Sequence, residues 1–164
     1  MSKGSLAKLL LAAGMLILAG VISIRWFQAE TGPSETAYFY DLSEKKLFVA
    51  PLSAVPPIPG MDGGEEDGVR AVVVSTTGNP NDESSFQIAY LEMYSPEFKA
   101  QIQANRTGEE TETRIGRSEA RSHSFVKRLE DSAWYPLNSD EAERILTEWQ
   151  KPGPGGQIPI VCVP

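Results

Sequence analysis

Apolar and charged residues are segregated along this chain, and that segregation constrains its architecture more than any other feature. No charged residue occurs from Leu9 to Ile24, whereas all 22 carboxylates lie beyond this stretch. About 16 uncharged residues rise roughly 24 Å as a helix, slightly less than a bilayer core. The flanking residues extend the span, because the Lys8 ammonium reaches back to the headgroups and three residues mark the opposite interface: Arg25, Trp26 and Phe27. We therefore predict one transmembrane helix within residues 1–27.

The charges on either side of this segment predict its orientation. Lys3, Lys8 and the terminal amine precede the apolar run, whereas Arg25 is soon followed by Glu30 and Glu35. The positive-inside rule then leaves the amino terminus in the cytoplasm. From Arg25 onward, 13 basic and 22 acidic residues give a formal net charge of −9, which suits a soluble extracytoplasmic domain. We expect a single-pass protein of the cell membrane.

A cleaved signal peptide is the alternative interpretation of the same segment. Such a peptide ends in a small-x-small site, and the nearest matches, Val21-Ile22-Ser23 and Phe27-Gln28-Ala29, are poor. A retained anchor is therefore the preferred interpretation. Its small residues fall on one stripe, and close packing of such residues joins helices in lipid. The predicted helix-packing positions are Ser5, Ala12, Ala13, Ala19 and Gly20.

Composition excludes several classes of function. The single Cys162 rules out an intrachain disulfide framework and a cysteine-rich zinc site, and the single His123 rules out an imidazole cluster. An acidic pI near 4.8 argues against nucleic acid as a partner. Cys162 lies in an apolar run and is expected to be a buried thiol. We predict no metal, no cofactor and no catalytic residue.

Beyond the anchor, the pattern predicts a polar tether over residues 28–36 and an α+β domain over 37–164, with a mostly antiparallel sheet and two helices. Runs 38–42 and 46–50 indicate a β-hairpin. Residues 51–68 predict a long exposed loop, with a polyproline II ligand and a calcium loop as weaker interpretations. Residues 70–75 indicate a buried strand. Residues 86–94 indicate its partner, with Phe86, Ile88 and Tyr90 on one face.

The second half of the domain contains both predicted helices. Ser95 as cap and Pro96 at the first helical position predict a helix to about Arg106, ended by Gly108. Residues 109–124 predict an exposed excursion with a weak edge strand at 113–116. Runs 124–129 and 133–137 indicate a second hairpin. A helix then begins at Asn138 or Ser139, where Asn138 and Glu141 resemble a capping box, and a last strand follows near 158–163.

Two groups of residues are candidate functional sites. Ser122-His123-Ser124 is the one place where hydroxyl and imidazole are sequence neighbours, but adjacent strand residues point apart, so we expect His123 on the surface rather than in catalysis. Tyrosine and tryptophan suit protein interfaces, because they bury large areas and keep a polar handle. The candidate interface aromatics are Tyr38, Tyr40, Tyr94, Trp134 and Tyr135.

Four short sequence segments resemble those of small membrane-anchored bacterial proteins with no assigned activity. They are Tyr38-Phe39-Tyr40-Asp41-Leu42, Leu47-Phe48-Val49-Ala50-Pro51, Val69-Arg70-Ala71 and Ala89-Tyr90-Leu91-Glu92. The resemblance covers about half the chain and implies an extracytoplasmic domain behind a signal-anchor. It implies no catalytic or ligand-binding residue.

Three functions are compatible with these features. The leading hypothesis is a non-catalytic accessory or scaffold subunit, held in the bacterial cell membrane by one helix, whose outer domain contacts other protein subunits of a membrane or envelope assembly. The second is a pilin-like or pseudopilin-like filament subunit, although the glutamate that such proteins place inside the apolar run is missing from Leu9 to Ile24. The third is an exported small-ligand-binding protein or hydrolase.

Overall fold

The computed structural model describes residues 35–109, 114–153 and 156–164. The predicted anchor, its packing stripe, its interface residues and most of the tether lie outside these residues. Residues Thr36–Pro164 form one compact unit. Within the three described stretches, no helix combines the length and apolar character needed to cross a bilayer.

The described part of the chain is an α+β domain with an antiparallel sheet and two α-helices, which confirms the predicted class. Its strands are β1 (Thr36–Asp41), β2 (Lys46–Pro51), β3 (Gly68–Ser75), β4 (Phe86–Tyr94), β5 (Ser124–Lys127), β6 (Tyr135–Pro136) and β7 (Ile160–Cys162). The helices are α2 (Pro96–Thr107) and α3 (Asp140–Glu148), with short 3-10 turns η1 (Glu83–Ser85) and η2 (Ala120–Ser122).

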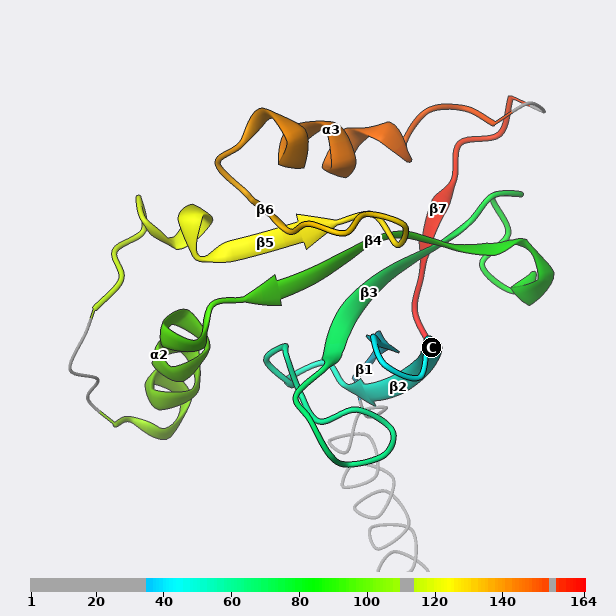
Figure 1. The fold of residues 1–164 in the computed structure, drawn as a ribbon. Coiled ribbons are helices and arrows are strands. Elements are labelled where there is room, and N and C mark those ends of the chain that lie inside the picture. The colour runs from blue at the N-terminus through cyan, green and yellow to red at the C-terminus, as the bar shows by residue number, and fades with distance from the viewer. Residues whose placement is uncertain (1–34, 110–113, 154–155) are drawn as a thin grey trace, which may run out of the picture. The chain divides into compact units, whose positions relative to one another are not determined.

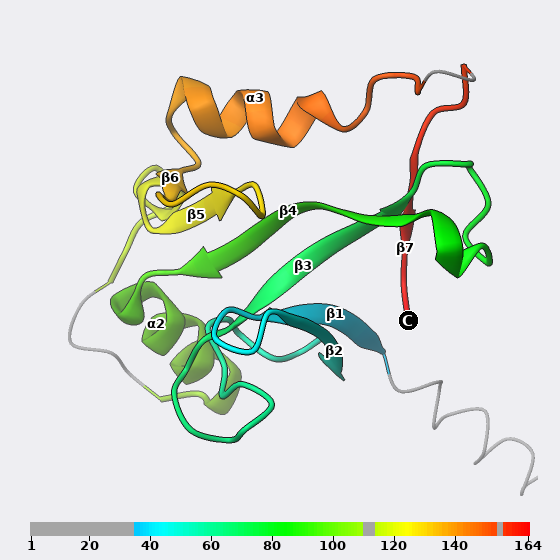
Figure 2. The same cartoon turned by 45° about the vertical axis from the view of Figure 1, so that its right-hand side comes forward.

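The strands follow the order β2-β1-β3-β4-β5-β6, and every pairing is antiparallel. β1 pairs with the first half of β3, whereas β7 pairs with its second half. Figure 1 shows α3 above the sheet and α2 beside one end of it. In the turned view of Figure 2, β7 runs along the end of the sheet opposite α2. Because β2 has only β1 as a strand partner in the described chain, it is an edge strand.

Local sequence signals fix both helices. Ser95 is the N-cap of α2, its Oγ accepting the Phe98 N–H, and Gly108 ends the helix with a φ of 77°. Left-handed backbone of this kind favours glycine. For α3, Ser139 is the N-cap and accepts the Ala142 N–H. The predicted start at Ser139 is confirmed, but the capping box built on Asn138 is wrong.

Three local predictions fail because tertiary contacts decide these segments. Residues 114–116 form no strand. Instead, Ile115 is buried, and Gln101 of α2 binds both its N–H and its carbonyl, at 2.6 and 3.0 Å. The predicted strand 133–137 shortens to β6. The loop after β2 is not wholly exposed, because Val55 and Pro56 are buried.

A β-bulge corrects the predicted facing of β4. The register shifts between Val72 and Val73 of β3, so that Val72 opposes Tyr90 while Val73 opposes Ile88, and Ala89 is the extra residue. Ile88 packs with Phe86 on one side of the sheet, whereas Tyr90 packs with α3 on the other. The prediction that Phe86, Ile88 and Tyr90 share a face is therefore wrong for Tyr90.

Candidate docking face

The two faces of the sheet carry two separate hydrophobic clusters. Under α3, Val126 of β5 packs with Ala142 and Ile145 of the helix. On the opposite face, the cluster is built from Val69, Ala71, Val73, Leu91 and Cys162, all buried. The expectation that Cys162 is a buried thiol is confirmed.

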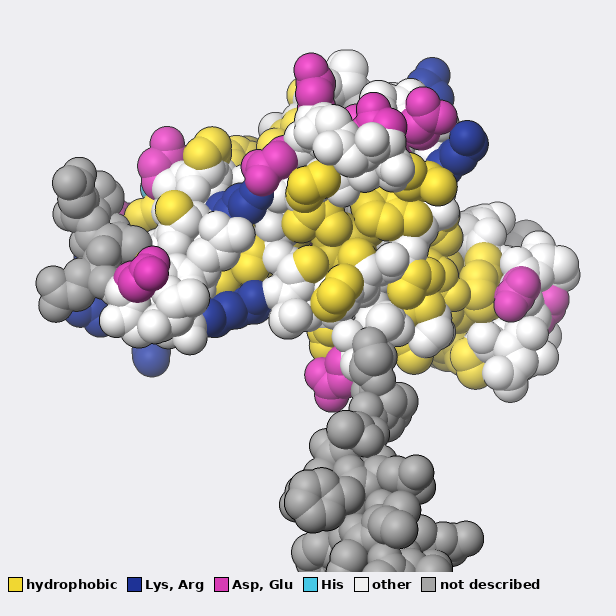
Figure 3. Space-filling view, turned by 90° about the horizontal axis from the view of Figure 1, so that it is seen from below, with side chains coloured by type: hydrophobic (Ala, Val, Ile, Leu, Met, Phe, Trp, Pro, Cys, Tyr) yellow, Lys and Arg dark blue, Asp and Glu magenta, His cyan; other side chains and the backbone are white. Residues whose placement is uncertain are grey.

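The cluster on the face opposite α3 draws its covering side chains from strands and loops. Its half-buried partners are Tyr38, Tyr40, Leu42, Phe86, Ile88, Met93 and Trp134. No described residue of α2 or α3 belongs to it. Figure 3, a view from the side away from α3, shows hydrophobic side chains gathered across the middle of this surface. We call this surface the open face.

The β1–β2 hairpin extends the open face to the edge of the sheet. Directly opposed residues of an antiparallel pair share a face, and Tyr38 opposes Val49 while Tyr40 opposes both Leu47 and Val69. Tyr38 and Tyr40 are half-buried, but Leu47 and Val49 are 38% and 51% exposed. The open face thus becomes progressively more exposed from β3 outward to β2.

The five predicted interface aromatics do not form one cluster. Tyr38, Tyr40 and Trp134 gather at the open face, where Tyr38 meets Phe86 edge to face at 6.4 Å and the Lys127 ammonium lies 5.3 Å from the Trp134 ring centre. Tyr135 packs under α3 instead. Tyr94 stacks edge-on against Phe98 of α2, 5.6 Å away.

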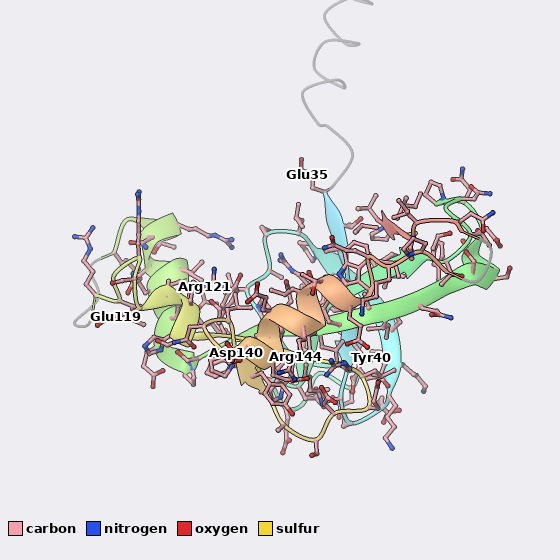
Figure 4. All side chains as sticks on the ribbon, turned by 90° about the horizontal axis from the view of Figure 1, so that it is seen from above. Glu35, Tyr40, Glu119, Arg121, Asp140 and Arg144 are labelled. Carbon is pink, nitrogen blue, oxygen red and sulfur yellow. The ribbon has the colours of Figure 1, made fainter. Side chains whose placement is uncertain are left out.

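The face that carries α3 is closed by charge as well as by packing. Arg128 bonds Glu141 and Glu148 of the helix at 2.8 and 2.6 Å, and Asp131 at 3.4 Å. The hydrogen bond from Arg128, together with its positive charge, holds the pKa of Glu148 below its usual range. Figure 4, seen from above, labels Asp140 and Arg144 on α3, with Tyr40 on β1 of the sheet below. These ion pairs join α3 to the residue that directly follows β5, so Arg128 has a structural role.

A shallow cleft of about 210 Å³ opens between the end of α3 and the bulged part of β4. Trp149, Ile145, Ala89 and Pro159 contribute to its walls. The Trp149 indole N–H is buried and has no hydrogen-bond partner in the described chain. Because this atom is itself shielded, it does not present a donor to the cleft.

Two neighbouring side chains of β4 on the α3 side of the sheet, Glu92 and Tyr90, have raised pKa values. Glu92 of β4 opposes Arg70 of β3. Burial raises the pKa of the Glu92 carboxyl, and the Arg70 charge opposes this effect. Burial likewise raises the pKa of Tyr90 to about 12, with a contribution from Glu92. One terminal nitrogen of Arg70 donates to the carbonyls of Leu52 and Ala54, and the guanidinium lies 5.7 Å from the Phe39 ring centre, whereas the buried Nε has no hydrogen-bond partner among the described residues.

One hydroxyl–imidazole pair was missed by sequence reasoning. The Oγ of Ser95 lies 2.9 Å from Nδ1 of His123, and the Ser95 N–H donates to the His123 carbonyl. The two residues are 28 positions apart, so no local pattern pairs them. His123 is half-buried rather than on the surface. The same Ser95 Oγ accepts the Phe98 N–H, so the hydroxyl serves as a helix cap that also ties α2 to the segment before β5.

Within the described residues, no group of three or more His, Cys, Asp or Glu side chains converges as a metal site would require. Comparison with known proteins adds no assignment, because no family model, no curated protein and no solved structure matches the chain.

Proposed function

We propose that this chain is a non-catalytic, membrane-anchored accessory or scaffold subunit whose outer domain docks onto a larger membrane or envelope assembly. The observation that carries the proposal is the open face. Its aromatic and aliphatic side chains have no helix over them in the described domain, and exposed apolar surface rimmed by polar residues is characteristic of protein interfaces. The uncharged run from Leu9 to Ile24 supplies the anchor.

The chemistry of the open face favours a protein partner. Tyr38, Tyr40 and Trp134 each combine a large apolar ring with a polar group, a combination enriched at interface hot spots. The net charge of −9 from Arg25 onward disfavours nucleic acid and anionic lipid surfaces, which attract basic residues.

Site-directed photocrosslinking in native cells tests the proposal. The crosslinking amino acid p-benzoylphenylalanine replaces Tyr40 on the open face, or Arg144 on α3 as the matched control. We expect one discrete adduct with another membrane or envelope polypeptide at position 40 and none at position 144. Adducts of equal yield at both positions, or none at either, would contradict docking through this face.

Membrane attachment is tested separately. The full chain should stay in the membrane fraction after a carbonate wash, with its N-terminus beginning before Leu9. A native chain that starts beyond Ile24, or that is released by carbonate, would contradict the anchor while leaving the docking experiment interpretable.

A hydrolase is the alternative for which the structure provides one observation, the contact of 2.9 Å between Ser95 and His123. Such a hydrogen bond is the first element of nucleophilic catalysis. The same hydroxyl accepts the Phe98 N–H at the start of α2, and this favours the capping role. A Ser95→Ala variant that loses an ester or peptide hydrolysis present in the wild type would reverse this preference.

A further inference from the structure

At the outer edge of β2, two residues combine exposed side chains with backbone groups that bond no other described residue. Neighbouring hydrogen bonds show which β1 residues direct their backbone N–H and carbonyl groups toward β3. The Leu42 N–H donates to the Asp67 carbonyl. Gly68, which opposes Asp41, instead exchanges both of its backbone bonds with Ile58. Even-numbered β1 residues therefore point their backbone groups toward β3, and odd-numbered ones toward β2. Through the register that pairs Phe39 with Phe48, the backbone groups of Leu47 and Val49 point outward.

The middle of this edge strand, between Lys46 and Pro51, lacks the usual protection against strand pairing. Natural edge strands are shortened, bulged, covered, or given inward charges and prolines. β2 has six residues and a regular register with β1. Leu47 and Val49 are the two residues within β2 whose backbone N–H groups point away from β1. Both side chains are apolar and exposed. Its charges and its proline lie at the ends, in Lys46 and Pro51.

The geometry points to a second copy of this chain as the strand that pairs with the edge: we propose that two β2 strands associate antiparallel about a twofold axis at Phe48. This register opposes Leu47 with Val49 of the other copy. Each such pair exchanges two backbone hydrogen bonds, so the two symmetric pairs supply about four. A twofold axis at Leu47 would instead pair Val49 with Lys45 of the other copy, but the φ of 53° at Lys45 ends the extended backbone. A twofold axis at Val49 would pair Leu47 with Pro51 of the other copy, and proline has no backbone N–H to donate.

The charge pattern also favours antiparallel self-pairing. In the register centred on Phe48, Lys46 faces Ala50 of the other copy and Lys45 faces Pro51. The positive end of each strand is thus kept away from its own counterpart, whereas a parallel arrangement would place Lys46 beside Lys46. Like charges directly opposed across strands are destabilising. The proposal uses the backbone edge of β2 and does not depend on the docking proposed for the open face.

A proline substitution tests the edge without touching the fold. The N–H of Val49 points outward, so Val49→Pro removes an intermolecular donor and leaves the β1 ladder intact; prolines in edge strands occupy such positions. Val49→Thr keeps the donor and is the matched control. We expect the full chain in mild detergent to sediment as a dimer in the wild type and in Val49→Thr, and as a monomer in Val49→Pro.

Disulfide trapping tests the register in membranes, in a Cys162→Ala background. Leu47→Cys and Val49→Cys copies carry different tags and are expressed together. Opposed residues at about 5.5 Å between Cα atoms are within disulfide reach, whereas like positions lie on a diagonal of about 7–8 Å. We expect the mixed disulfide to exceed each homodisulfide at least fivefold, with none at Leu129→Cys, an exposed control.

Several outcomes would overturn self-pairing. A dimer that survives Val49→Pro would place the contact elsewhere, for example in the predicted anchor helix. A wild-type chain that is monomeric at every concentration, or cysteines at 47 and 49 that react only with another polypeptide, would make the edge unpaired or heterologous. Mixed and homodisulfides in equal yield would refute the register centred on Phe48.

Discussion

Gly68 is the position where the structure makes the sharpest prediction about stability. A methyl group built there would lie 2.9 Å from Cζ of Phe48, 3.0 Å from Cγ1 of Ile58 and 3.0 Å from the Ile58 carbonyl oxygen. Ordinary contacts to a Cβ are 3.4–4 Å, so each neighbour would have to withdraw by roughly half an ångström. The carbonyl cannot withdraw freely, because it accepts the Gly68 N–H at 2.8 Å while the Ile58 N–H returns a bond of the same length.

The expected cost of Gly68→Ala follows from two opposing terms. Overpacking of this kind destabilises by about 1–3 kcal/mol. Replacing glycine also restricts the unfolded chain, which offsets about 0.4–1 kcal/mol. The central values of the two terms, about 2 and about 0.7 kcal/mol, leave a net loss of about 1–2 kcal/mol in the free energy of unfolding.

Urea unfolding of the full chain in mild detergent, followed by tryptophan fluorescence, measures this loss. The midpoint should fall at unchanged slope. Gly116→Ala is the control, since its added methyl group would meet only Ser118 Oγ, 4.0 Å away. Phe48→Leu removes the nearest clashing atom, so it should cost less in the Gly68→Ala background than alone. Additive losses in the double variant, or a Gly68→Ala protein as stable as the control, would refute the steric argument.

Three further predictions concern polar groups. Ser95→Ala should lower stability by about 0.5–2 kcal/mol through loss of the α2 cap, and Ser95→Asp should restore most of it; thermal unfolding of both variants checks this. Burial raises the pKa of Glu92 above its ordinary 4.5, so stability declines as pH rises from that value to the folded pKa. The urea midpoint of Glu92→Gln should therefore exceed that of the wild type at pH 7, and the difference should disappear below pH 4.5. An equal increase in the midpoint at both pH values would contradict the burial argument. The N–H of Glu44, followed by that of Met61, lowers the pKa of Asp41, so its stabilisation is complete above the unfolded value near 3.8 and disappears as pH falls through the folded pKa. Asp41→Asn should flatten that acid limb in a pH series of urea midpoints.

The parts of the fold that sequence predicts well are those whose signals are local. Ser95, Pro96 and Gly108 define α2 within a single segment, and the run around β3 is apolar because both faces of that strand are covered. The start of α3 was ambiguous between two neighbouring residues, because Asn138 and Ser139 are both good caps. Backbone geometry selects Ser139.

The parts that sequence could not predict depend on partners distant in the chain. Ile115 looks like one apolar residue in a charged segment, and only Gln101 of α2 explains its burial. The pairing of Ser95 with His123 has the same origin. The bulge at Ala89 leaves no signal in the alternation of β4, yet it moves Tyr90 to the other side of the sheet.

This bulge also determines which aromatic residues are available at the open face. With regular pairing, Tyr90 would follow Phe86 and Ile88 onto that face; the extra residue instead directs it toward α3. The open face then depends on β1 and β2; the pairings of β1 with β2 and of β1 with β3 have no register shift. The sequence feature that signals an interface is therefore the alternation of Tyr38, Tyr40, Leu47 and Val49, rather than the number of aromatic residues.

The two proposed contacts of this hairpin use different atoms, and this makes them separable. A partner on the open face would touch the side chains of Tyr40, Leu47 and Val49, whereas a second copy at the edge would bind the backbone of Leu47 and Val49. Val49→Pro removes one outward N–H and leaves the Tyr40 ring in place, so it should abolish self-pairing and preserve the photocrosslink at position 40. If that variant abolished both, the open face would be complete only in the paired form, and docking would require two copies of the chain.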